Sequence, residues 1–107
     1  MRSQREVQAF YACILATLAY AASMNSKQRK TLKAVFADPI SPAIEWTAIE
    51  NLLVSAGCRV VEGAGSRVRF VFNAEIESFH RPHPAKEAKR YQVKAARDFL
   101  MRIGVRP

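Results

Sequence analysis

The sequence has few cysteines, no internal repeat and no low-complexity tract. Its two cysteines, Cys13 and Cys58, fall in segments of different character. They do not make the disulfide framework of a small secreted domain, so we expect free thiols in a reducing compartment. Half of the residues are hydrophobic, which excludes a chain that is disordered by composition.

Negative charge is also scarce. There are 17 Lys and Arg residues and 9 Asp and Glu residues, which gives a formal net charge of +8. An excess of this kind favours polyanionic partners: nucleic acid, an anionic membrane surface or an acidic protein. The length of 107 residues predicts one domain with its own core.

The longest uncharged run, from Val7 to Ser26, lies near the start of the chain. Its apolar part is short for a membrane span, which needs about 20 apolar residues. Three interpretations of residues 1–23 stay open: a cleaved export signal, an extra helix packed on the domain, and a start codon assigned too early. The chain from Met24 onward makes a complete domain by itself, which favours the third interpretation. We therefore expect an N-terminal extension over 1–23, a domain over 24–107 and a cytoplasmic protein that binds no membrane.

Two helices are predicted in the first half of this domain. The first covers Lys27–Ala37, with Ser26 as its N-cap. The second covers Glu45–Ala56, and Gly57 is well placed to end it. Trp46 shares the apolar stripe of the second helix, so we expect it in the core.

Three short strands and a closing helix follow. The predicted strands are Cys58–Glu62, Arg67–Phe72 and Ile76–His80, and the predicted helix is Lys89–Ile103. This order of elements predicts an α+β fold: a three-stranded antiparallel sheet with helices packed on one face.

Basic and proton-transferring side chains gather around the second and third strands. Ser66 lies in the preceding turn, and Arg67 and Arg69 alternate with the apolar residues of the second strand. The third strand leads into His80, Arg81 and His83, which include both histidines of the chain. Arginine binds phosphate, and histidine transfers protons near neutral pH, as RNA cleavage without a metal requires. Other interpretations stay open: the arginines as solvated strand cations, His80 as an exposed strand end, and His83 as a residue that locks a turn.

Further cations surround the start of the closing helix. They are Lys86, Lys89, Arg90 and Lys94. Such side chains suit contacts to RNA phosphates, which supply affinity without sequence information. Nothing in the sequence predicts a cofactor. The two histidines have no cysteine near them and do not predict a metal site.

Four features in a fixed order suggest a family. They are the helix that ends in Gly57, the Gly65-Ser66 pair that opens a strand containing Phe70, the His83-Pro84 pair after the last strand, and the closing helix that ends in Ile103-Gly104-Val105. Over Met24–Pro107 this order resembles the HicA toxins of bacterial type II toxin–antitoxin systems. The resemblance implies a double-stranded-RNA-binding-like fold, an endoribonuclease that cleaves mRNA, and a HicB-like antitoxin as partner.

The chain departs from this family at one important position. The usual motif is Gly-Ser-His with a catalytic histidine, and this chain has Arg67 at that place. Arginine stays protonated and is a poor general base. We therefore expect His83 or His80 to transfer the proton, with Arg67, Arg69 or Arg81 at the phosphate. The alternative is a non-catalytic RNA-binding module that has lost the motif histidine.

Overall fold

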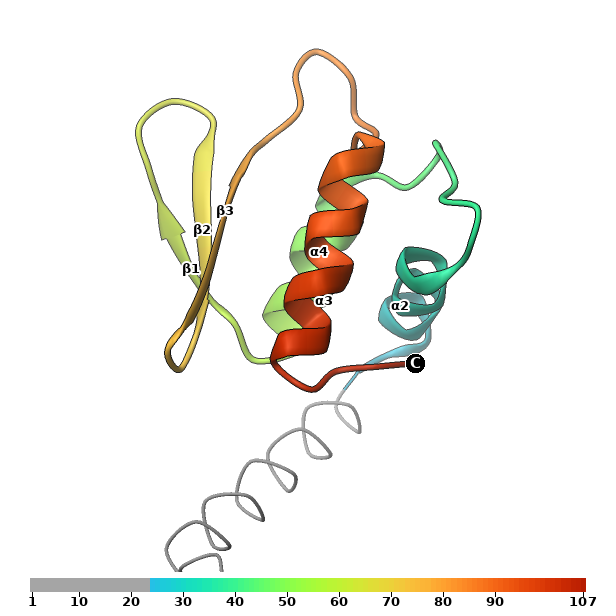
Figure 1. Cartoon of the computed structure of the whole chain (residues 1–107). Helices are drawn as coiled ribbons and strands as arrows, with labels where there is room; N and C mark the ends of the chain where they lie inside the picture. Colours follow the sequence, from blue (N-terminus) through green and yellow to red (C-terminus); the bar gives the residue numbers. More distant parts are fainter. Residues whose placement is uncertain (1–23) are drawn as a thin grey trace, which may run out of the picture.

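The computed structural model describes residues 24–107, so the predictions for 1–23, including Cys13, lie outside the described residues. The elements in order are α2 (Ser26–Phe36), α3 (Trp46–Ser55), β1 (Arg59–Glu62), β2 (Arg67–Phe72), β3 (Glu75–His80) and α4 (Arg90–Arg102). The strands form one antiparallel sheet in the order β1-β2-β3 (Figure 1). The predicted α+β class is confirmed. In the described part of the chain, no helix combines the length and apolar character that crossing a membrane requires.

The helices occupy one side of the sheet. α3 and α4 lie next to the strands, and α2 packs on both of these helices (Figure 1). β2 directs Val68 and Phe70 into the core between the layers, and β3 adds Phe79. The centroid of the Trp46 ring in α3 lies 5.1 Å from the ring centroid of Phe79 and 6.5 Å from that of Phe70. Trp46 is therefore a core residue, as predicted, and the opposite face of the sheet carries no helix of the described part.

Capping interactions explain why the helix limits differ slightly from the prediction. Asn25, and not Ser26, is the N-cap of α2. The side chain of Asn25 accepts a hydrogen bond from the Gln28 backbone N–H at 2.9 Å, and the Gln28 side chain accepts one from the Asn25 N–H at 3.0 Å. This reciprocal pair satisfies two backbone donors at the helix start. The prediction of Ser26 as N-cap was wrong because the sequence offers two adjacent capping residues.

The remaining cysteine lies in the core. Cys58 is buried just before β1. Burial raises the pKa of its thiol to about 12, because the thiolate would lose its hydration. The thiol therefore stays protonated and unreactive near neutral pH.

Candidate RNA-binding and catalytic site

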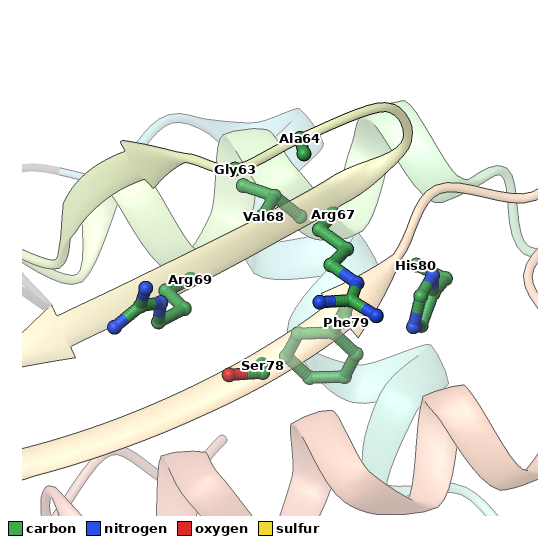
Figure 2. A pocket seen from close by; sticks show the side chains of 8 residues that line it. All are labelled: Gly63, Ala64, Arg67, Val68, Arg69, Ser78, Phe79 and His80. Atoms are coloured by element: carbon green, nitrogen blue, oxygen red, sulfur yellow. The ribbon is translucent and has the colours of Figure 1, made fainter.

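The pairing of β2 with β3 brings two predicted site residues together. Arg67 lies directly opposite His80 in the strand register. Because the neighbouring residues Val68 and Phe79 point into the core, Arg67 and His80 point to the outer face of the sheet. Directly opposite residues in an antiparallel pair have Cβ atoms about 4.5–5.5 Å apart. The register thus places a permanent cation beside an imidazole (Figure 2).

A hollow of about 400 Å³ surrounds this pair. It is lined by Gly63, Ala64, Arg67, Val68, Arg69, Ser78, Phe79 and His80 (Figure 2). Arg69 and Ser78 are the next pair of opposite residues on the same face of the sheet, so two arginines line the hollow. Within residues 24–107, the exposed side chains of Arg67, Arg69 and His80 have no ion pair or hydrogen bond to the protein. All three side chains are available to a ligand.

A glycine allows the β1–β2 turn to fold closely against Arg67. The Gly63 backbone N–H donates to the Arg67 carbonyl oxygen at 2.9 Å. A Cβ atom on Gly63 would lie 2.9 Å from the Cβ of Arg67, closer than two such carbons approach without a shift. Ser66 is exposed in the same turn, and its carbonyl oxygen accepts from the Arg81 N–H at 2.9 Å. The turn therefore has a defined position beside the hollow.

Gln92 holds the end of β3 from the core side. Its side chain is buried, with 2% of the residue exposed. Its Nε2 donates to the His80 carbonyl oxygen at 2.6 Å, and its Oε1 accepts from the Lys89 backbone N–H at 2.9 Å. These two bonds join the backbone of His80 to the first turn of α4. Gln92 is not among the site residues predicted from the sequence, where its signal is a polar side chain beside Val93 on the core-facing stripe of the helix.

The structure gives Arg81 partners within the protein. Its guanidinium donates to both carboxylate oxygens of Glu62, each at 2.7 Å, and its Nε donates to Glu50 at 2.6 Å. Trp46 Nε1 also donates to Glu50, at 2.6 Å. The hydrogen bond from Arg81 lowers the pKa of Glu62, and the two carboxylates raise the pKa of Arg81. Arg81 thus ties β1 and α3 to the chain after β3, and its predicted contact with RNA stays a prediction.

His83 lies apart from the Arg67–His80 pair. It is exposed in the segment between β3 and α4, and the prolines on either side of it line a different groove, at the start of α3. A hydrogen bond of 2.9 Å from the Trp46 N–H to the Lys86 carbonyl oxygen ties this segment to α3. Among the described residues, no group of three or more His, Cys, Asp or Glu side chains could hold a metal ion.

The predicted cations of the last helix form a second group. Lys86, Lys89, Arg90 and Lys94 are all exposed, over the end of the loop and the first turns of α4. None of them has an ion pair within the part of the chain that the structure describes. Because Gln92 bonds to His80, this start of α4 lies next to the strand end that carries the imidazole.

Comparisons with known proteins give one match. A family model described as the HicA toxin of bacterial toxin–antitoxin systems matches residues 46–105, which is more than half of the chain. The matched range begins at Trp46 and ends at Val105, so it contains α3, the whole sheet and α4. No curated protein and no solved structure matches the chain significantly.

Proposed function

The chain belongs to the HicA toxin family, and we propose that it acts as an endoribonuclease that binds and cleaves mRNA. Membership of this family implies a toxin with an antitoxin partner. In our proposal that partner is a HicB-like protein, and the toxin acts in the cytoplasm. Cleavage of mRNA needs no cofactor or metal ion, and it blocks translation and growth.

The chemistry that this chain's residues suit is attack by a ribose 2′-hydroxyl on the adjacent phosphate. The His80 imidazole takes the 2′-hydroxyl proton while the 2′ oxygen bonds to phosphorus. The bond from phosphorus to the 5′ oxygen breaks, and that oxygen takes a proton from the second histidine, His83, or from water. Arg67 and Arg69 hold the phosphate and stabilise its added negative charge. The products are a 2′,3′-cyclic phosphate and a 5′-hydroxyl.

One observation carries this proposal: the position that lacks the motif histidine has a histidine directly opposite it. Arg67 and His80 are cross-strand partners on the exposed face, with no protein partner for either side chain among residues 24–107. A proton-transferring group therefore remains at this place in the fold although the motif position holds arginine. The second candidate is an RNA-binding module without cleavage, which the arginine at the motif position favours.

Induced expression of the full chain in bacteria without an antitoxin tests the proposal. We expect growth arrest and breakdown of a reporter mRNA, and we expect His80→Ala to abolish both. His83→Ala removes the second histidine, from the separate loop, and should reduce toxicity less, because water can supply the leaving-group proton in its place. Normal growth and intact mRNA, with folded and abundant parent protein, would contradict cleavage and favour the second candidate.

A further inference from the structure

One aromatic ring has no structural role in the core. Tyr91, in the first turn of α4, is 64% exposed. In the part of the chain that the structure describes, it is the one exposed aromatic residue, and its ring contacts no other ring. Exposed tyrosine rings are apolar surfaces with a strong capacity for stacking.

Contacts at the two ends of α4 show where this ring lies. Gln92 bonds to the carbonyl oxygen of His80 at one end of β3. At the other end of the same strand, Arg102 contacts Glu75 at 3.1 Å and Glu77 at 2.9 Å. α4 therefore runs antiparallel to β3 along its length, with its first turn beside His80 (Figure 1).

The helical repeat places Tyr91 on the exposed surface of α4, on the side of the helix toward β3. Tyr91 precedes Arg102 by 11 residues (102 − 91), which at about 100° per residue is roughly 20° beyond three full turns. The two residues therefore lie in one row along the helix. Because Arg102 reaches β3, Tyr91 lies over the same flank at the end that carries His80.

Cations adjoin the ring on the helix surface. Arg90 precedes Tyr91, and Lys94 follows it by one turn; both are exposed and have no ion pair among the described residues. Proteins that bind single-stranded nucleic acid combine such basic surfaces with aromatic rings on which bases stack. A base in a duplex is stacked between its neighbours and cannot cover the ring.

We propose that Tyr91 is a stacking platform for an unpaired base of the RNA whose phosphate lies at Arg67 and His80. This inference rests on the proposed function and specifies its substrate as single-stranded RNA. The hollow holds the phosphate on the outer face of the sheet, and the ring on α4 holds a base on the helix side. The same RNA strand reaches both by passing around β3, which is an edge strand of the sheet.

Binding of two RNA probes to the full chain tests the platform. The first probe is a single-stranded oligonucleotide with a 2′-O-methyl group on every ribose, which removes the attacking hydroxyl and separates binding from cleavage. The second probe is the same strand annealed to its complement. Fluorescence anisotropy gives Kd for the parent, Tyr91→Ala, Tyr91→Leu, Tyr91→Phe and, as control, Val54→Ala, an exposed apolar residue on α3.

We expect Tyr91→Ala and Tyr91→Leu to weaken binding of the single strand about tenfold, and binding of the duplex less than twofold. Tyr91→Phe keeps the ring and should stay within about twofold of the parent, as should Val54→Ala. Unchanged binding of the single strand by Tyr91→Ala would overturn the platform, and so would equal losses for both probes. A parent protein that binds neither probe would contradict the proposed function itself, and the platform with it.

Discussion

At the residue scale, two side chains together cover the tasks of the motif histidine in the proposed cleavage. Arg67 cannot accept a proton, but it binds phosphate and stabilises negative charge. His80 can transfer the proton, and the strand register holds it directly opposite. The two residue types are complementary, so the arginine at the motif position is compatible with cleavage.

The first prediction concerns Gln92, which we regard as a positioning residue for His80. Gln92→Met keeps the length of the side chain but removes both hydrogen bonds, so the His80 carbonyl loses its donor. We expect stability to fall by about 1–2 kcal/mol. We also expect kcat to fall about tenfold, because His80 is no longer held in position. KM should change little, because the proposed phosphate ligands Arg67 and Arg69 lie on β2.

A matched core variant separates positioning from simple destabilisation. Leu100→Val affects another buried residue of α4 that lies two turns beyond Gln92. It should lower the melting temperature but leave kcat near that of the parent. Equal losses of kcat in both variants, or a Gln92→Met enzyme with unchanged kcat, would show that Gln92 does not position His80.

At the element scale, the sheet and helices are joined by polar contacts as well as by the core. Arg81 is the clearest case, because its ion pairs link β1, α3 and the segment after β3. These contacts fix how the strand end that carries His80 enters the loop. The contribution of the Arg81–Glu62 ion pair to stability is small, because the side chain of Glu62 is 65% exposed and solvent screens the pair.

The second prediction is that Arg81 acts on stability more than on RNA. The folded-state pKa of Glu62 is lowered by Arg81, so this pair contributes stability above the ordinary glutamate pKa and loses it as pH falls through the lowered value. Arg81→Met should therefore unfold at lower denaturant concentration than the parent at neutral pH. The difference should shrink as the pH falls from neutral through the lowered pKa of Glu62.

Urea unfolding over this pH range, beside RNA binding at neutral pH, provides the check. Arg81→Lys is the control because it keeps the charge but loses the two-pronged contact with Glu62. If the difference in urea midpoint between the parent and Arg81→Met stays constant with pH, the ion pair is not the cause of the difference. A large loss of RNA affinity with unchanged stability would instead assign Arg81 to the phosphate.

The elements themselves could be predicted from the sequence because their signals are local. The β2 range was predicted as it stands, and the limits of α3 and α4 differ only in whether the caps are counted. Partners distant in sequence could not be predicted. Periodicity gives the helix face on which Gln92 lies but not which atom it meets, and no local signal pairs Arg81, which follows β3, with Glu62. The bonds to Glu62 and His80 span 19 and 12 residues.

At the scale of the whole molecule, residues 24–107 bury one face of the sheet and leave the other face open to ligands. The core lies between the sheet and α3 and α4, so the outward side chains of β2 and β3 are not needed for packing. A net charge of +8 attracts a polyanion to the molecule. The hollow and the start of α4 supply cations that have no ion pair within residues 24–107.

The candidate site was only partly accessible from the sequence. Composition and the resemblance identified the right residue types, and the strand pattern put Arg67 and Arg69 on one face. The choice between the two histidines needed the register, because one lies on β3 opposite Arg67 and the other on a loop. Tyr91 could not be identified from the sequence, because a role for an exposed ring follows only from the residues that lie near it in space.

The decisive measurement is the single-turnover rate of RNA cleavage by the purified full chain and by His80→Ala. We predict that the parent produces 2′,3′-cyclic phosphate ends, and that His80→Ala is slower by roughly 10²–10⁴-fold while its Kd for RNA stays within about twofold. A His80→Ala protein that cleaves at nearly the parental rate would contradict the assignment of proton transfer to the Arg67–His80 pair.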